Sequence, residues 1–274
     1  MLRWLKYVVI GLLAMVLLAG SGIYAGSILR LTQRYDMPVT AFDVAHFPMA
    51  PEEAERRALS MMCADCHQKA GQVLFEAPWV GKLVTPNLTR VARDYTDGEL
   101  ERLIRKAVKK DGTGAMVMPA KTYAMLADED VAAIIQWLRG LKPEPDAVPA
   151  GSEFGPLGRL ALATDKLPFE ADHLPGHVPA KTRPDDIGRY LVGVSCLHCH
   201  QMKTDHDNGF GMKMPALAAM TRAYSFDQFA ALLNTGKPIG GRQMACMSKV
   251  SREAFAFFSD AQKRAIYDHL IRIE

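Results

Sequence analysis

The chain has 274 residues, 49% of them hydrophobic, and a formal net charge of +3. This length is typical of two domains. So small an excess of positive charge argues against nucleic acid or a strongly acidic protein as the main partner. The 15 methionines either fill gaps in small cores or include one or two metal ligands.

The first 50 residues contain one long apolar run. Residues 7–29 carry no charged side chain, and about 20 apolar residues are enough for one transmembrane helix. Arg3 and Lys6 precede the run and favour a cytoplasmic segment 1–6. We therefore expect an uncleaved transmembrane anchor at 7–29 and a tether at 30–50.

A cleaved signal peptide is the alternative for this run, with small residues near Ala19 or Ala25 as cleavage sites. Both interpretations place the remaining chain on the far side of the cytoplasmic membrane. The length of the run favours the anchor. The expected location is the bacterial inner membrane, with the folded domains on the periplasmic side.

Two segments of the pattern Cys-x-x-Cys-His follow, and this pattern is the attachment signature of c-type haem. Each pair of thiols can form two thioethers with one haem, and the adjacent histidine can bind its iron. The sequence therefore predicts two covalently bound haem c groups. The residues that attach the first haem are Cys63 and Cys66, and His67 binds its iron. In the second motif, Cys196 and Cys199 attach the haem, and His200 binds its iron.

Zinc binding and dithiol chemistry are the alternatives for these cysteines. A zinc site made of two such pairs usually has about 12–20 residues between them, whereas Cys66 and Cys196 are 130 residues apart. Redox-active dithiols would not require a histidine after both second cysteines. Haem attachment explains all of these residues.

The two motifs belong to an internal repeat. Residues 51–67 align with 184–200, and each segment begins with proline followed by two acidic residues, as helices often do. Further helices are expected after Thr96 and Ser225, and closing helices at 128–141 and from Ser259. We expect an all-α fold with two tandem haem domains, 51–142 and 184–274, joined by an extended Pro/Gly-rich connection at 143–183.

The sixth iron ligands are expected on a loop before each closing helix. Met118 lies 51 residues after His67, and Met247 lies 47 residues after His200. Met116 and Met125 are the alternatives in the first unit and Met244 in the second, whereas Met212 and Met214 are expected to pack. Five histidines could replace a methionine, although none occupies equivalent places in both repeats: His46, His173, His177, His206 and His269.

Other residues near the motifs have two interpretations each. Thr85, Asn87 and Tyr123 could contact haem propionates or brace the Met118 loop, or they could be turn and core residues. Cys246 could replace Met247 as an iron ligand or be a small buried thiol. His198 is expected at the surface, and Trp137 in the core.

With these residues in place, the chain resembles a membrane-anchored dihaem cytochrome c of class I type, similar to the dehydrogenase-linked cytochrome subunits of bacteria. The resemblance covers residues 52–273 and is carried by CADCH, TPNLT at 85–89, YTDGELERLI, MVMPAKTY and LADEDVAAIIQWL. The second repeat lacks TPNLT, and its methionine is not followed by proline. Such subunits often carry three haems, and a third motif is absent here.

The resemblance implies electron transfer in a respiratory chain, with no catalytic residue. The expected donor is a dehydrogenase or quinol-linked complex, and the expected acceptor is a soluble cytochrome or terminal oxidase. The alternative is a dihaem enzyme, of peroxidase or thiosulfate-oxidising type, with one open or Cys-ligated haem. The segment with Arg102, Arg105, Lys106, Lys109 and Lys110 could offer a basic docking face or a solvated helix end.

Overall fold

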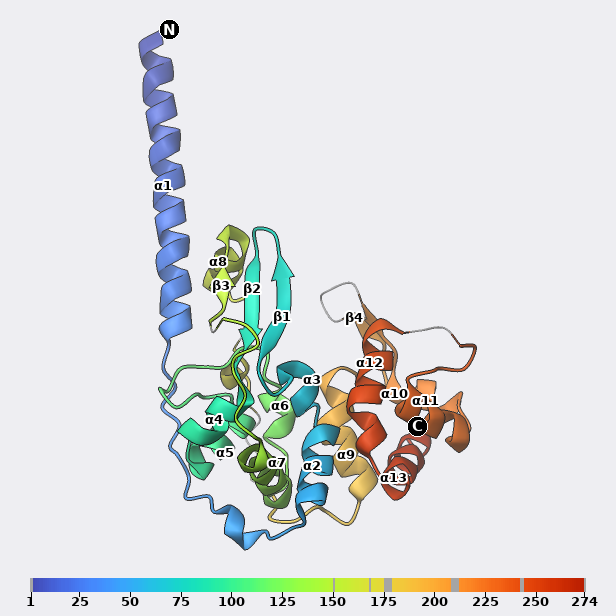
Figure 1. The fold of residues 1–274 in the computed structure, drawn as a ribbon. Helices are drawn as coiled ribbons and strands as arrows, with labels where there is room; N and C mark the ends of the chain where they lie inside the picture. Colours follow the sequence, from blue (N-terminus) through green and yellow to red (C-terminus); the bar gives the residue numbers. More distant parts are fainter. Residues whose placement is uncertain are drawn as a thin grey trace.

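A long N-terminal helix stands apart from a mostly helical body in the computed structural model (Figure 1). The structure describes residues 2–149, 151–167, 169–174, 179–207, 212–241 and 244–273. Helix α1 spans Leu2–Thr32. Its segment Arg3–Thr32 is long and apolar enough to cross a membrane, and a stretch of 18 residues within it has a mean hydropathy of 2.3. A membrane anchor and a signal sequence both have these properties.

The first helical unit follows a tether that contains one 3-10 turn, η1 (Val44–His46). Pro51 in the first turn and Glu52 and Glu53 beside it begin α2, as the sequence predicted. The predicted capping box of Thr96 and Glu99 begins α5. The helices of the unit are α2 (Pro51–Ser60), α3 (Cys63–His67), α4 (Leu88–Asp94), α5 (Asp97–Lys106), α6 (Ala120–Tyr123) and α7 (Asp128–Gly140).

A β-hairpin interrupts this unit, so the all-α expectation was incomplete. Strands β1 (Gln72–Ala77) and β2 (Gly81–Thr85) pair antiparallel, and β3 (Glu153–Phe154) adds to the outer side of β2. Val73 pairs with Val84, and Phe75 with Leu83. Valine, leucine and phenylalanine before a Pro-Trp-Val turn and leucine and valine after it are typical of a hairpin. The all-α expectation had assigned no strand to this stretch.

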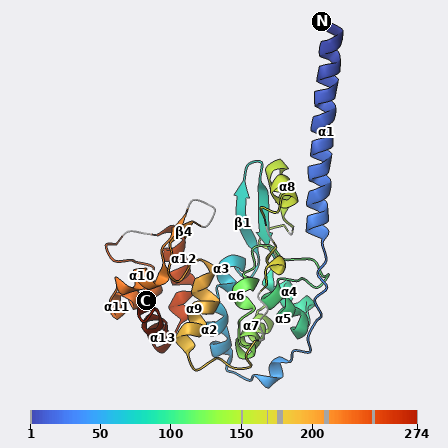
Figure 2. The same cartoon turned by 180° about the vertical axis from the view of Figure 1, so that it is seen from behind.

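The connection between the units also contains regular structure that was not expected. Besides β3, it forms helix α8 (Pro156–Ala163) and the 3-10 turn η2 (Glu170–Asp172). Pro156 occupies the first turn of α8, where proline is well tolerated. The hairpin and α8 lie next to each other and beside the lower part of α1 (Figures 1 and 2).

The second helical unit repeats the order of the first. Asp186 caps its first helix, three residues later than the alignment predicted, and the expected capping boxes at Ser225 and Ser259 are both present. Its elements are α9 (Ile187–Ser195), η3 (Cys196–His198), β4 (His206–Asp207), β5 (Lys213–Met214), α10 (Leu217–Arg222), α11 (Phe226–Thr235), α12 (Ala245–Glu253), η4 (Phe255–Phe257) and α13 (Asp260–Ile271).

The two units pack against each other around one continuous core. First and last helices pair in both units, α2 with α7 and α9 with α13. The buried cluster runs without a break from Leu100 and Ile135 in the first unit to Leu191 and Leu270 in the second. Burial of apolar surface across this junction therefore stabilises both units together.

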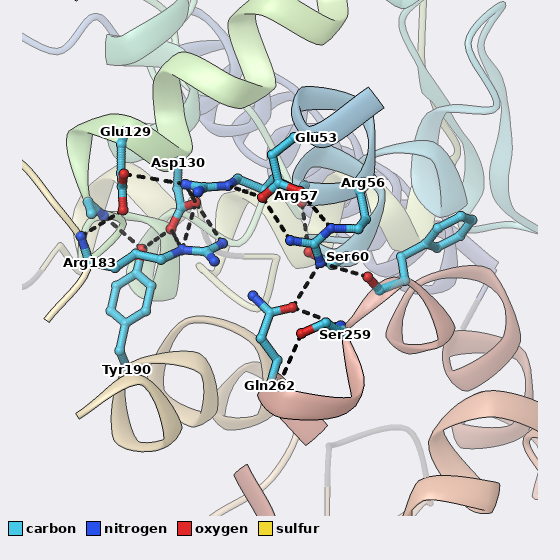
Figure 3. Close-up of polar contacts among 12 residues, drawn as sticks. Glu53, Arg56, Arg57, Ser60, Glu129, Asp130, Arg183, Tyr190, Ser259 and Gln262 are labelled. Carbon is cyan, nitrogen blue, oxygen red and sulfur yellow. Dashed lines mark hydrogen bonds and ion pairs between the residues drawn. The ribbon is translucent and has the colours of Figure 1, made fainter. Parts of the chain in front are cut away.

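A polar network lies at the same junction (Figure 3). The Asp130 carboxylate, at the start of α7, is 1% exposed and pairs with Arg57 at 3.1 Å and Arg183 at 2.7 Å. The Tyr190 hydroxyl on α9 donates to Asp130 Oδ2 at 2.6 Å and accepts from the Ala127 amide at 2.8 Å. On the other side, Arg56 donates to Gln262 Oε1 at 2.8 Å. These contacts join α2 and α7 to α9 and α13.

Candidate haem-attachment sites

The first Cys-x-x-Cys-His motif forms a helix of five residues directly after α2. Met62, in the left-handed conformation at a φ of 61°, separates the two helices. Cys63 and Cys66 are three residues apart on α3, so both sulfurs lie on the same side of one helical turn. The expected pair of neighbouring thiols is therefore present.

His67 has a hydrogen bond that selects its iron-binding nitrogen. Its Nδ1 lies 3.2 Å from the carbonyl oxygen of Pro86. A carbonyl only accepts, so Nδ1 carries the proton and Nε2 keeps its lone pair for a metal. Burial lowers the pKa of His67, which further favours the neutral ring that a metal requires.

The second motif uses the same hydrogen bond. His200 Nδ1 lies 2.9 Å from the carbonyl oxygen of Pro215, and burial lowers the pKa of this histidine as well. The Leu217 amide donates to Gln201 O at 3.0 Å, just as the Leu88 amide donates to Lys69 O at 2.7 Å. Met214–Leu217 therefore takes the place that TPNLT has in the first unit.

The sequence analysis missed this equivalence because only the proline and a leucine two residues later are shared. Pro86 follows His67 by 19 residues, whereas Pro215 follows His200 by 15. The shorter spacing and different neighbours hid the repeat. A search for Pro-x-Leu after each motif would have found it.

An apolar cavity adjoins the second motif. Cys196, Cys199 and His200 lie along it, and the remaining lining residues are almost all aliphatic, aromatic or sulfur-containing. A large, flat, mainly apolar group held by two thioethers fits these residues, so the second site can hold a haem.

The cysteine thiols have the opposite properties from those of a redox-active dithiol. Burial raises the pKa of Cys63 to about 12 and that of Cys196 to about 11, whereas reactive dithiols depend on a lowered thiol pKa. Among the residues that the structure describes, no three His, Cys, Asp or Glu side chains converge as a metal site. The zinc alternative thus finds no ligand set in that part of the chain.

Met118 lies on a loop, as the sequence predicted. It is half-buried and packs against the apolar core. The preceding residue, Val117, has a φ of 62°, which reverses the chain before Pro119 and the short helix α6. The structure therefore holds Met118 between a left-handed residue and a proline, and its role as an iron ligand stays a prediction.

Met247 lies in the first turn of helix α12, so the expected loop position was wrong. The buried Ser248 explains the helix: its hydroxyl donates to Gly236 O at 2.6 Å and accepts from the Met244 amide at 3.0 Å. Met247 still lines the cavity with Cys199 and His200. Met62, Met214 and Met220 line it too, so the cavity offers four thioethers.

Cys246 adjoins the same cavity. It is exposed, and its Sγ lies 3.4 Å from Met212 Sδ, so the alternative of a buried packing thiol was wrong. It also lines the cavity next to Met247. A thiolate ligand therefore remains an alternative for the second site.

The histidine alternatives are scattered. His206 lies opposite Met214 in the β4–β5 pair, close enough to His200 to lower its pKa further. His269 faces Asp186 at 4.0 Å, and His46 faces Asp43 at 3.6 Å. His177 lies outside the described residues. His198 is exposed, as predicted.

The three possible haem-pocket residues have partners within the protein. Thr85 Oγ1 donates to Gln72 O at 3.3 Å across the hairpin. Asn87 Oδ1 caps α4 by accepting from Thr89, and its Nδ2 donates to Glu144 O at 3.0 Å. The Tyr123 hydroxyl is buried beside the first motif and donates to Met61 O. All three brace the protein, and contact with a haem stays a prediction.

The alternative of a basic docking face is not formed as a whole. Arg102 and Arg105 are buried, at 8% and 4% exposure. Arg102 donates to carbonyl groups of the tether and of the Lys109 loop, and Arg105 pairs with Glu101 at 3.0 Å and Asp128 at 2.6 Å. The positive charges of this helix thus satisfy internal acceptors.

The two motifs lie close together, which the sequence did not reveal. Helix α12, which carries Met247, contacts α3, and α6 contacts η3. Lys249 Nζ lies 2.7 Å from Asp65 Oδ1 inside the first motif, and Met62 lines the cavity of the second. Burial raises the pKa of Cys66, and Cys199 lies near enough to contribute to that rise.

Residues 50–138 match the family model of cytochrome c oxidase, cbb3-type, subunit III. The match covers α2 to α7 and contains the first motif and Met118. The first unit is thus similar to a cytochrome c domain, and proteins of this class carry covalently bound haem c.

Two curated relatives are cytochrome c subunits of dehydrogenases. The chain is 29% identical over 175 residues to the cytochrome c subunits of the quinone alcohol dehydrogenases of Gluconacetobacter polyoxogenes and Komagataeibacter europaeus. Each match covers 57% of this chain and 36% of the relative, so the chain matches about a third of their length. The predicted likeness to dehydrogenase-linked cytochrome c subunits is confirmed.

Proposed function

We propose that this protein is a membrane-anchored dihaem cytochrome c that transfers electrons. The electrons come from a dehydrogenase or quinol-linked complex and go to a soluble cytochrome or terminal oxidase. Residues 51–142 and 184–274 are its two tandem class I domains, joined by 143–183. The observation that carries the proposal is the closeness of the two motifs, joined by Asp65 and Lys249.

Each motif supplies the same set of groups. Cys63 and Cys66, like Cys196 and Cys199, would attach one haem c, and His67 and His200, whose proton is fixed on Nδ1, would bind its iron. Met118 and Met247 would be the second iron-binding residue of each site. The bound haem would supply one-electron transfer without binding substrate, and a thioether ligand would raise its potential. The residues around it exclude water and hold these ligands in place.

The relatives' names support the choice of partners, because both are cytochrome c subunits of a quinone-linked dehydrogenase. Helix α1 is proposed to hold the protein in the bacterial inner membrane, with both domains on the periplasmic side. An intact mass of the purified protein decides between an anchor and a removed signal peptide. A mass that lacks the first 19 to 25 residues would contradict the anchor.

The first test is the ratio of haem to polypeptide in the full-length, detergent-solubilised protein. We expect two per chain, and one in each double variant, Cys63→Ala with Cys66→Ala or Cys196→Ala with Cys199→Ala. Cys246→Ala is the matched control and should retain two. A ratio of one in the unaltered protein, or no loss in the second double variant, would show that the dihaem proposal is wrong.

The second test separates an electron carrier from an enzyme. Methionine ligation gives a far-red sulfur-to-ferric-iron band, and carbon monoxide should not change the reduced spectrum. If carbon monoxide binds, one iron is open, and the dihaem enzyme becomes the better proposal. Cys246 lines the cavity beside the second motif, so the second site is the one to examine. A band pattern altered by Cys246→Ala would indicate a thiolate ligand.

A further inference from the structure

Helix α8 packs directly along the end of the apolar helix α1. The Arg159 guanidinium donates to Ser27 Oγ at 3.0 Å and lies 4.3 Å from the centre of the Tyr24 ring. A Cβ added at Gly26 would lie 3.3 Å from Ala163 Cβ, so the two backbones approach closely. The contact fixes α8 to the membrane-length helix.

The hairpin turn is fixed to α8 in the same way. The Leu157 amide donates to Trp79 O at 2.9 Å, and the Gly155 amide donates to Val80 O at 3.0 Å. A Cβ added at Gly158 would lie only 2.1 Å from Val80 O. Glycine is therefore required for this approach. The turn, α8 and α1 form one connected structure. Both views show the hairpin and α8 beside α1 (Figures 1 and 2).

The contacts also give the level of α8 along α1. Arg30, after the apolar run, pairs with Asp165 at 2.7 Å just beyond the end of α8. Arg159 lies beside Tyr24, six residues further into the run, which is about 9 Å at about 1.5 Å per residue. Leu157 and the attached hairpin turn follow in the same direction. They therefore lie level with the apolar part of α1.

The outward surface at this level is apolar. Trp79 is 72% exposed, Leu157 53% and Leu160 39%. Helix α8 contains no acidic residue, and its single charge, Arg159, is turned toward α1. Trp79 also has a φ of 64°, a conformation that costs a bulky residue energy. In water alone, nothing would offset the exposure of this side chain.

Charged residues limit how deep this surface can lie. Glu76 is paired in register with Lys82, and Lys82 Nζ lies 3.4 Å from Glu153 Oε1. Glu76 and Lys82 are each three residues from Trp79, and Glu153 on β3 is paired in register with Lys82. The three therefore stay in water or among headgroups while only the turn goes deeper. Tryptophan prefers that boundary because its ring is apolar and its N–H is polar.

We propose that the hairpin turn around Trp79 and the outer face of α8, at Leu157 and Leu160, rest in the interface of the lipid bilayer that α1 crosses. The inference depends on the proposed anchor. It sets the height and tilt of the first cytochrome domain above the membrane. The domain is then held at three points, α1, α8 and the hairpin, and does not swing freely on its tether.

Photo-crosslinking tests the proposal on the full-length, haem-loaded protein in nanodiscs of phosphatidylcholine and phosphatidylglycerol. p-Benzoylphenylalanine is placed singly at positions 79, 160, 13 and 271, and lipid adducts are counted by mass spectrometry. Leu13, 58% exposed on α1, reports the anchor. Ile271, 38% exposed on α13, is the control on a helix away from α1.

We expect lipid adducts at positions 79 and 160 with a yield near that at 13, and only background at 271. Adducts at 13 without any at 79 would overturn the interface and leave the anchor intact. No adduct at 13 would overturn the anchor, and the interface with it. If native membranes give a protein adduct at 79 in place of lipid, the surface belongs to a partner protein and the proposal is wrong.

Discussion

Lys249 Nζ lies 2.7 Å from Asp65 Oδ1, and this ion pair joins the first haem-attachment motif to the helix that carries Met247. Lys249 also lies 3.5 Å from Glu253 on its own helix. Asp65 raises the pKa of Lys249, so the lysine stays charged. One positive charge therefore lies between the two proposed haem sites.

Replacing Lys249 with methionine should lower the reduction potentials, because a nearby positive charge favours the ferrous form. The loss of stability should be small, about 0.5 kcal/mol, since Lys249 is half exposed and such pairs contribute little. A redox titration measures the shift. Lys166→Met, in the connection, is the control, and equal titrations of both variants would contradict the prediction.

Replacing Met118 with histidine should leave the haem attached, because Cys63 and Cys66 remain, and should lower the potential of that site. About half of the far-red band should be lost with it. Met116→His is the matched control two residues away, and it should leave the titration unchanged. An unaltered titration of the Met118 variant would reject Met118 as the ligand.

Asp130→Asn should destabilise the fold strongly. The change leaves Arg57 and Arg183 without their shared buried carboxylate, and breaking such a pair costs about 3–5 kcal/mol. Denaturant unfolding measures the loss. Asp260→Asn alters a 93% exposed carboxylate and should change stability by less than about 0.5 kcal/mol. Similar losses in both variants would mean that burial does not determine the effect.

Glu53 should make the junction sensitive to acid. A hydrogen bond from Arg56, aided by Arg57 and opposed by burial, lowers its pKa from 4.5 to about 2. Because the folded-state pKa is depressed, its contribution is fully present above about pH 4.5 and is lost as the pH falls towards 2. That contribution is about 0.5–1 kcal/mol, as a third of the side chain is exposed.

Glu53→Gln tests this directly through thermal midpoints at several pH values. The variant should be less stable than the unaltered protein near neutral pH, and the two should converge at about pH 2. Glu55→Gln, on the exposed side of the same helix, is the control. A gap between Glu53→Gln and the unaltered protein that does not change with pH would contradict the prediction.

Gly158→Ala should separate the hairpin from α8. The added methyl group would meet Val80 O, a backbone atom that cannot turn away, and such overpacking costs about 1–3 kcal/mol. Gly193→Ala, in helix α9, meets nothing within 4 Å and should stabilise by about 0.5–1 kcal/mol. Unfolding measurements compare the two, and a neutral Gly158→Ala would argue against a rigid contact.

The local parts of the fold could be predicted from the sequence, because their signals are local. The capping boxes at Thr96, Ser225 and Ser259 are where the sequence placed them. The motifs could be recognised because their residue order carries their chemistry. The hairpin was missed although its pattern was readable, because the fold was expected to be all-α.

Contacts between distant segments could not be predicted. Nothing local in Lys249 indicates Asp65, 184 residues earlier in the chain, and Pro215 takes the role of Pro86 through its carbonyl, a group that every residue has. Met247 was expected on a loop, but it lies on helix α12. That helix is held by Ser248, whose partner Gly236 lies at the end of α11, and the sequence around Met247 does not indicate this contact. Such positions are decided by packing.

The Tyr190 hydroxyl, placed between Ala127 and Asp130, has a consequence for how the chain can be divided. A cut within 143–183 would produce two fragments, each with an apolar surface and buried polar groups without partners. Two such fragments should find each other again and restore the native spectrum. The two helical units are therefore complementary pieces of one fold.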